Sequence, residues 1–359
     1  MKLVIKIGTQ AILSKDGIPF EDIIFNLVKQ IAKLQKEGHQ VILVSSGAVG
    51  SGRRIARQLL GREYGHSVAE KQVLASIGQH DLMQIYAKMF KEYNILVSQL
   101  LLTKQDFQTR THYLNIARLL REILDHKNII PIINENDSVA IEELMFTDND
   151  ELAGLIALQM NADKLIILSN VNGVCDKSPE LIDAKLISII DPNLNDLPKI
   201  STTKNIHGRG GMLTKLNTAL KVSDSGVTVH IASLNENNVI FRIIDNELVG
   251  TKIIASKNKS NIKKWISFNS DRQNGSIFVN NCLSGLLKDN NKALSILPVG
   301  VEKLMGKFKK GDLVEVLGSN GEKIAVGIAK YDYLELGQYI GQKNSPEFIH
   351  YDYLQIIRV

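Results

Sequence analysis

Short apolar runs rich in β-branched residues alternate along this chain with longer segments of helical periodicity. Segments with apolar residues at a period near ~3.6 separate these runs, for example 22–37 and 111–125. Because strands that alternate with helices pair as parallel neighbours, this order predicts a mostly parallel sheet covered on both faces. We therefore expect a three-layer α/β/α sandwich over residues 1–255. The apolar runs are LVIKI (3–7), VILV (41–44), ILVSQLLL (95–102), IIPII (129–133), KLIIL (164–168) and VTVHI (227–231).

The character of the sequence changes after the polar stretch 255–264. No long helical pattern dominates there, and short strand-like runs alternate with turn signals such as GSNG at 318–321. We expect a linker at 256–274 and a small β-barrel at 275–359. The strand-like runs are GSIFV (275–279), DLVEVL (312–317) and EKIAVGIA (322–329).

Composition narrows the class of protein further. With 44% hydrophobic and 23% charged residues among 359, the chain has the make-up of a folded protein and not of a disordered one. Its two cysteines, Cys175 and Cys282, form no Cys-x-x-Cys pair, which argues against a disulfide framework or a zinc site. The amino terminus shows no secretory signal and no stretch is apolar enough to span a membrane, so we expect a cytoplasmic protein.

A lysine lies inside the first apolar run. Lys6 is followed two residues later by Gly8, at the end of the strand expected at 3–7. In an open parallel sheet, ligands collect at the carboxyl ends of the strands. A buried charge is costly unless it is paired, so Lys6 indicates an active-site lysine; the alternative is an edge lysine that extends to water.

Two glycine-rich segments follow later strands or open helices. The segment SSGAVGSG (45–52) can receive an anion closely, or it is a tight connection chosen for packing, and the pattern leaves both open. Neither a G-x-G-x-x-G fingerprint nor a P-loop is present there. The segment GRGGMLTK (208–215) combines a glycine pair, a lysine and a helix start. That combination favours a phosphate site at Lys215 over a flexible hairpin.

Two acidic clusters lie between the glycine-rich segments. NEND (134–137) ends one apolar run, and DNDE (148–151) opens a helical pattern. A helix N-cap at Asp148 or Asn149 explains one acid of the second cluster but not a second carboxylate near a lysine-bearing phosphate site. Such carboxylates would orient the lysines or hold an amine.

These segments occur in the order typical of one enzyme family. On these motifs the chain resembles the amino acid kinase family, and within it the glutamate 5-kinases, over nearly its whole length. The segment 297–316 and the following hairpin into 327–332 are similar to a PUA domain, a small β-barrel known from RNA-modifying enzymes. The ordered motifs are KIGT (6–9), VSSGAVGSG (44–52), INENDSV (133–139), DND (148–150), ADK (162–164) and GGMLTK (210–215).

The resemblance implies a reaction and a set of site residues. The implied reaction is ATP-dependent phosphorylation of the γ-carboxylate of L-glutamate to L-glutamyl 5-phosphate, the first step of L-proline synthesis, with Mg²⁺ brought by the nucleotide and no metal site on the protein. Lys6, Asp150 and Lys215 match catalytic positions, in which Asp150 holds the two lysines in place. Ser46, Asp137 and Asn149 match substrate-binding positions. The positions that match ATP-binding ones are Lys6, Gly8, Ser169, Asn170, Arg209, Gly210, Gly211, Met212, Leu213, Thr214 and Lys215.

The chemistry of that reaction agrees with the residues. A carboxylate with a pKa near ~4.3 is already ionised at pH 7, so the reaction needs cations around the phosphates and no general base. We expect Asp137 to pair with the free α-ammonium of glutamate, which N-acetylglutamate lacks. The sequence departs from the family on the nucleotide side, where many members carry Thr-Asp in place of Ser169-Asn170, threonine in place of Arg209, and an aromatic residue near Cys175.

The resemblance also implies partners. L-Proline is the expected feedback inhibitor, glutamyl phosphate reductase the expected downstream partner, and a dimer or tetramer the expected assembly. Two alternatives stay open: another amino acid kinase acting on aspartate, N-acetylglutamate or a nucleotide, and an RNA-binding protein that acts through the PUA-like domain. The weak charge of residues 261–359, with 13 basic and 10 acidic residues, argues against a strong RNA surface.

Overall fold

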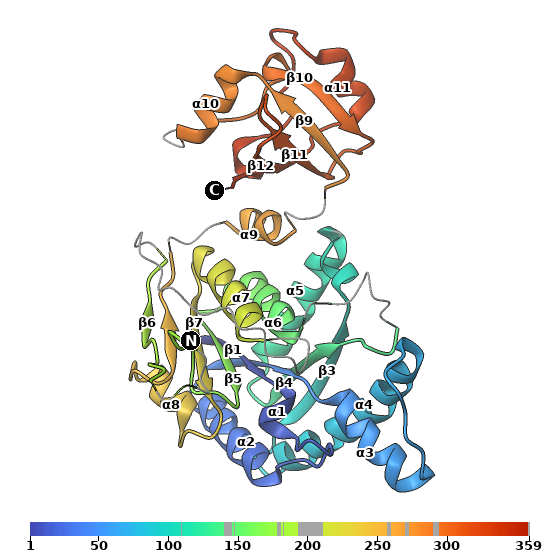
Figure 1. Cartoon of the computed structure of the whole chain (residues 1–359), viewed down its shortest axis with the longest axis vertical. Coiled ribbons are helices and arrows are strands. Elements are labelled where there is room, and N and C mark those ends of the chain that lie inside the picture. Colours follow the sequence, from blue (N-terminus) through green and yellow to red (C-terminus); the bar gives the residue numbers. More distant parts are fainter. Residues whose placement is uncertain are drawn as a thin grey trace. The chain divides into compact units, whose positions relative to one another are not determined.

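A computed structural model gives the fold of the chain (Figure 1). It describes residues 1–108, 110–139, 146, 148–177, 181, 183–192, 211–256, 260–269, 273–289 and 294–357. The chain divides into two compact units, Met1–Asn258 and Lys259–Val359. No helix among these described residues is long and apolar enough to cross a membrane.

An eight-stranded sheet in the order β3-β4-β2-β1-β5-β7-β8-β6 forms the centre of the first unit. The pairs among β1 to β5 and β7 are parallel, and only β8 runs antiparallel to its neighbour β7 among the described pairs. All the strands expected from the apolar runs are therefore confirmed. The strands are β1 (Lys2–Ile7), β2 (Gln40–Ser45), β3 (Leu96–Leu102), β4 (Ile129–Glu135), β5 (Lys164–Ser169), β6 (Ile189–Ile190), β7 (Thr228–Ser233) and β8 (Thr251–Ile253).

Helices cover both faces of this sheet, so the expected three-layer α/β/α sandwich is confirmed (Figure 1). Helices α2, α4 and α8 share one apolar core with alternate residues of β1 and β2. Helix α6 contacts both α5 and α7, and α5, α6 and α7 contact the strands β4, β1 and β7 respectively. The helices are α1 (Thr9–Ile12), α2 (Glu21–Lys36), α3 (Ala48–Leu60), α4 (Val68–Lys91), α5 (Arg110–Asp125), α6 (Asn149–Met160), α7 (Met212–Asp224) and α8 (Val239–Ile244), with a 3₁₀ turn at Lys104–Phe107.

Glycines of the segment 45–52 hold α3 against α4. A Cβ on Gly52 would lie 1.9 Å from the carbonyl oxygen of Leu74, and one on Gly78 would lie 1.8 Å from that of Ala48. Gly47, just before α3, has a left-handed φ of +117° that disfavours other residues. Of the two interpretations left open for this segment, packing therefore accounts for Gly47 and Gly52.

The second unit contains a five-stranded sheet in the order β10-β9-β11-β12-β13. Its core includes Phe308 and Phe348, whose ring centroids lie 5.6 Å apart. Helix α9 occupies the middle of segment 256–274, where we expected a linker, and it contacts β12 and β13. The elements are α9 (Asn261–Phe268), β9 (Gly275–Val279), α10 (Asn281–Asp289), β10 (Val301–Gly306), β11 (Leu313–Leu317), β12 (Lys323–Ile328), α11 (Tyr333–Tyr339) and β13 (Leu354–Ile356), with 3₁₀ turns at Pro298–Gly300 and Tyr351–Tyr353.

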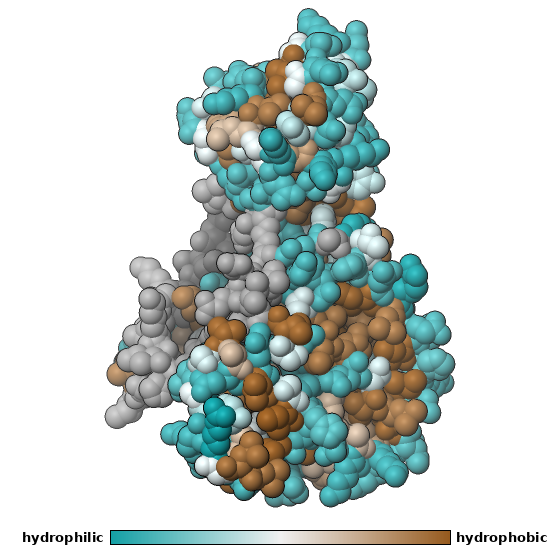
Figure 2. All heavy atoms as spheres, turned by 90° about the vertical axis from the view of Figure 1, so that its right-hand side faces the viewer, coloured by the Kyte–Doolittle hydropathy of each residue, from teal (hydrophilic) through white to brown (hydrophobic). Residues whose placement is uncertain are grey.

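Apolar side chains also reach the surface of the first unit. Figure 2 shows brown hydrophobic residues gathered among hydrophilic ones on one face of the molecule. Leu96 of the edge strand β3 is 64% exposed, and Leu119 of α5 is 49% exposed. Exposed apolar area of this kind is what association of copies would bury. The expected dimer or tetramer stays a prediction.

A buried histidine, His230, lies in β7. It is 1% exposed, and neither ring nitrogen has a hydrogen-bond partner among the described residues. Burial, helped by the charges of Lys164 and Lys252, lowers the pKa of His230 to about 3. Between that value and ~6.5 the unfolded chain binds a proton that the folded chain does not, so the free energy of unfolding falls as pH falls.

We expect this imidazole to remove about 2 kcal/mol from the free energy of unfolding between pH 7 and pH 5. His230→Leu should flatten that part of the pH profile in urea-unfolding measurements. His126→Leu, a change at an exposed histidine just after α5, should leave the profile unchanged. An unaltered slope in His230→Leu would show that other groups carry the acid sensitivity.

Candidate active site

Two lysines from distant parts of the chain share one buried carboxylate. Lys6 of β1 places its Nζ 2.5 Å from Asp150 Oδ1, and Lys215 of α7 places its Nζ 2.8 Å from Asp150 Oδ2. The side chain of Asp150 is 0% exposed, and those of Lys6 and Lys215 are 5% and 13% exposed. The structure thus joins the three residues expected to be catalytic into one cluster with a formal excess of positive charge.

The pKa values in this cluster reflect burial and charge. Burial alone would raise the pKa of Asp150, but the ammonium groups of Lys6 and Lys215 outweigh it and hold that pKa below its usual value. Burial lowers the pKa of Lys6, which Asp150 partly opposes and Lys215 reinforces. The carboxylate therefore stays ionised between two cations, and the lysines are kept close together in spite of their repulsion.

Asp148 caps the helix that carries Asp150. Its Oδ1 accepts hydrogen bonds from the backbone N–H groups of Asp150 at 2.9 Å and Glu151 at 3.1 Å. The N-cap interpretation of the cluster 148–151 therefore holds for Asp148, and Asp150 is the second carboxylate that capping does not explain. Burial, then the charge of Asp150, raises the pKa of Asp148.

A second polar group lies next to this cluster at the start of α6. Asn149 Nδ2 donates to Ser46 Oγ at 2.8 Å and to Asn134 Oδ1 at 2.9 Å. Asn134 Nδ2 in turn donates to Gln79 Oε1 at 2.8 Å. Two of the residues expected to bind substrate, Ser46 and Asn149, are therefore in direct contact, and Asn134 and Gln79 extend the group.

Asp137, the third expected substrate residue, lies just after β4. It lines a cavity of about 290 Å³ together with Gln79 and Ala48. Glu135, Asn136 and Ser138 also line this cavity. The carboxyl ends of β2 and β4 and the start of α6 thus bring polar residues of both sequence clusters to one edge of the sheet, where Asn149 contacts Asn134.

The residues expected to contact the nucleotide follow β1 and β5 and open α7. Among the described residues, a Cβ on Gly8 would meet only Lys6 Nζ at 3.7 Å and Leu168 O at 3.8 Å, and one on Gly211 would meet nothing within 4 Å. Packing against these described residues therefore does not require glycine at either position. Two ammonium groups close to the amino-terminal end of α7 suit a phosphate chain.

The other residues expected to bind the nucleotide differ from one another in burial and in hydrogen bonding. Ser169 is buried and its Oγ accepts from Val171 N–H at 3.3 Å, whereas Asn170 is exposed and donates to Gln10 Oε1 at 3.2 Å. Met212, Leu213 and Thr214 form the first turn of α7, and Thr214 Oγ1 donates to Gly211 O at 2.7 Å. Arg209 and Gly210 lie outside the described residues.

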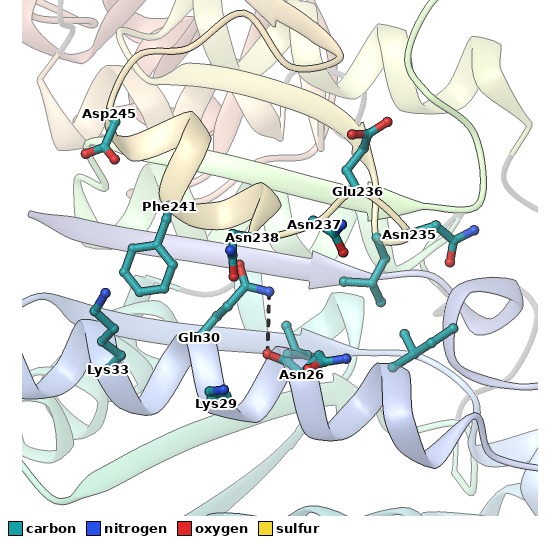
Figure 3. A pocket seen from close by; sticks show the side chains of 13 residues that line it. Asn26, Lys29, Gln30, Lys33, Asn235, Glu236, Asn237, Asn238, Phe241 and Asp245 are labelled. Atoms are coloured by element: carbon teal, nitrogen blue, oxygen red, sulfur yellow. Dashed lines mark hydrogen bonds between the residues drawn. The ribbon is translucent and has the colours of Figure 1, made fainter.

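A cavity of about 470 Å³ lies elsewhere, between α2, α8 and the residues that precede α8. In Figure 3 Lys33 faces the ring of Phe241, with its Nζ 4.4 Å from the centroid, and Gln30 donates to Asn26 O at 3.4 Å. None of the expected site residues lines this cavity. The described residues also contain no group of three or more His, Cys, Asp or Glu placed to hold a metal ion.

Comparison with known proteins identifies the family. The model of the amino acid kinase family matches residues 1–233, and the model of the PUA domain matches residues 286–350. A protein named glutamate 5-kinase from Bacteroides thetaiotaomicron is 39% identical and covers 99% of this chain and 98% of its own length. Proteins of the same name from Chlorobaculum tepidum and Caldanaerobacter subterraneus are 41% and 40% identical, covering 99% and 96% of this chain and 97% and 91% of their own lengths. The chain therefore belongs to the amino acid kinase family and carries a PUA domain on its carboxy-terminal side.

Proposed function

We propose that this chain transfers the γ-phosphoryl group of ATP to the side-chain carboxylate of L-glutamate and releases L-glutamyl 5-phosphate and ADP. The observation that carries the proposal is the pair of lysines, Lys6 and Lys215, held 2.5 and 2.8 Å from the single carboxylate of Asp150. The near full-length relatives named glutamate 5-kinase support the choice of acceptor.

The reaction makes a bond between one oxygen of the glutamate γ-carboxylate and the γ-phosphorus. The bond from that phosphorus to the oxygen bridging to the β-phosphate breaks, and the electron pair leaves with ADP. The nucleophile is already anionic at pH 7, so no proton has to be removed. The barrier is the approach of two anions, and fixed cations placed around the transferring group lower it.

Lys6 and Lys215 supply these fixed cations. Asp150 neutralises only one of the two ammonium charges, so the cluster keeps a net positive charge for the phosphates. Because Asp150 is 0% exposed and bound on both oxygens, it fixes the spacing of the lysines before substrates arrive. Mg²⁺ brought with the nucleotide would neutralise further phosphate charge.

Glutamate would bind beside this cluster at the residues from β2, β4 and α6. Ser46 Oγ accepts from Asn149, which leaves its own O–H as a donor for a substrate carboxylate. Asn149 Oδ1 is buried without a hydrogen-bond partner among the described residues, and an ammonium group would satisfy it. Asp137 would add the opposite charge that an α-ammonium requires.

An acceptor panel tests the proposal. Purified protein with ATP, Mg²⁺ and hydroxylamine should form a hydroxamate with L-glutamate. Aspartate, N-acetylglutamate and nucleoside monophosphates serve as the competing acceptors, the last followed by ADP release. Turnover confined to one of these competitors would overturn the assignment of glutamate while leaving the kinase family intact.

Asp137→Asn should raise KM for glutamate about 10- to 100-fold, which is the loss of affinity expected when one charge-assisted hydrogen bond is removed. KM for ATP should stay within twofold of its value in the parent protein. The physical reason is that the amide keeps the shape of the side chain but not its charge. Steady-state kinetics with each substrate varied in turn measure both constants. Glutarate, which lacks the ammonium group, should inhibit the variant and the parent equally. A change in KM for ATP alone would place Asp137 on the nucleotide side.

Feedback inhibition by L-proline, association with glutamyl phosphate reductase, a homo-oligomer and RNA contact through the PUA domain stay predictions. Each has a direct check: inhibition of the hydroxamate assay by proline, co-purification with the reductase, mass in solution, and RNA binding at varied salt. The domain limits of 1–255 and 275–359, with 256–274 between them, are likewise proposed for the intact protein.

A further inference from the structure

The side-chain amides of Asn149, Asn134 and Gln79 form a chain of hydrogen bonds. Only one orientation of the three amides is consistent with these bonds. The backbone N–H of Glu135 donates to Asn134 Oδ1 at 2.9 Å, and a backbone N–H can only donate. Asn134 Oδ1 is therefore the acceptor and Asn134 Nδ2 the donor. It follows that Gln79 presents Oε1 to Asn134 and that Asn149 presents Nδ2, which fixes all three amides from one backbone group.

This orientation leaves one buried donor and one buried acceptor without partners among the described residues. They are Gln79 Nε2 and Asn149 Oδ1. Both atoms are themselves buried, and Gln79 as a whole is 8% exposed, so water does not compensate fully for either loss. Unpaired buried polar atoms cost stability, and where they occur in a native fold they call for an explanation.

We propose that Gln79 is a positioning residue for the acceptor substrate. By accepting from Asn134 Nδ2, Gln79 holds Asn134 Oδ1 toward Asn149, and so keeps Asn149 Oδ1 free for the α-ammonium of the substrate. The inference rests on the proposed function and extends it to a residue of α4 that no motif of the sequence indicates. Gln79 acts through Asn134 and Asn149, and its own contact with substrate is not required.

The position of Gln79 suits this task. It lies on α4 next to Gly78, where a Cβ would lie 1.8 Å from the carbonyl oxygen of Ala48 in α3, and α3 begins two residues after Ser46. Ser46 is itself bound to Asn149. A rigid contact between the two helices therefore fixes both ends of the group, Gln79 at one end and Ser46 at the other.

Gln79→Met tests the proposal because it removes the acceptor oxygen and keeps the length of the side chain. We expect KM for glutamate to rise roughly five- to tenfold, the worth of one hydrogen bond, with KM for ATP unchanged within twofold. The Ki of glutarate as a competitor should change less than twofold, because glutarate has no ammonium group to meet Asn149 Oδ1. A merely structural role would move all three constants or none.

A double-mutant cycle with Asn134→Ala separates positioning from packing. If Gln79 acts through Asn134, Gln79→Met should have no further effect on KM for glutamate once Asn134 is alanine. Additive effects would overturn the proposal.

Gln35→Met is the matched control. Gln35 is 7% exposed on α2, makes one side-chain hydrogen bond, to Ile129 O at 3.0 Å, and leaves Oε1 unpaired among the described residues. It should cost a similar amount of stability and leave both KM values unchanged. An equal rise of KM for glutamate in Gln35→Met would also contradict the proposal. The proposed function is tested separately with the parent protein. Absence of glutamate turnover in the parent would overturn that function. An active parent, together with a Gln79→Met variant whose KM for glutamate is unaltered, would overturn only this inference.

Discussion

Lys215→Ala is expected to lower kcat about 10³-fold while KM for glutamate changes less than threefold. Lys215 is one of two ammonium groups at the cluster, and its charge matters most when negative charge is spread over the transferring phosphoryl group. Removing one such electrostatic contact from a site shielded from water commonly costs 10²- to 10³-fold or more. The side chain is 13% exposed, so water replaces it poorly.

Steady-state kinetics with ATP and glutamate varied separately measure this split. Lys221→Ala is the control, since Lys221 lies exposed in the last turn of the same helix. It should keep kcat within twofold. If Lys215→Ala raises KM for ATP and leaves kcat intact, Lys215 binds the nucleotide in its ground state and does not assist the transfer.

Asp150→Asn should abolish measurable turnover and lower the free energy of unfolding by about 3–5 kcal/mol. The substitution leaves two ammonium groups, from Lys6 and Lys215, next to a neutral amide in a site where the side chain is 0% exposed. Removing one partner of a buried ion pair is costly because the remaining charge has lost its compensation. Urea unfolding at pH 7 measures the change in stability.

A second substitution separates the effect on stability from the effect on catalysis. Lys6→Met added to Asp150→Asn removes one of the two uncompensated charges and should restore part of the lost stability. Activity should not return, because the spacing of the lysines and one of the cations are both gone. Recovery of turnover in the double variant would show that neither Asp150 nor Lys6 has the proposed role.

Much of the fold was predictable because the strands are buried on both faces. Continuous apolar runs such as LVIKI and KLIIL have few other uses in a folded chain, and the structure places strands there. For α3, the sequence indicated only that the glycine-rich segment 45–52 opens a helix or forms a tight connection, and the contact of its glycines with α4 appears only in the fold. Helix α9 was not predicted, because a polar, lysine-rich stretch precedes and enters it and is typical of a linker. In the fold, Trp265 of this helix is only 4% exposed.

The candidate site was predictable where a residue is of an unusual type for its position in a strand or helix. Lys6 is a charge in an apolar strand, and Asp150 is an acid that capping does not explain, so both stand out from the sequence. Gln79 is not unusual in this way, since a glutamine in a long helix is ordinary. Its contact with Asn134 depends on how α4 packs against the end of β4, which is a tertiary fact that no local pattern encodes.

The central claim is that a carboxylate oxygen of glutamate attacks the γ-phosphorus of ATP. Glutamate labelled with ¹⁸O in its γ-carboxylate tests this directly, because the amine of the product displaces phosphate when glutamyl phosphate cyclises, and that phosphate keeps the oxygen that made the bond. The account predicts one ¹⁸O atom in each phosphate released by cyclisation, and one such phosphate for each ADP formed. Unlabelled phosphate would mean that water attacks ATP instead, and would contradict the account.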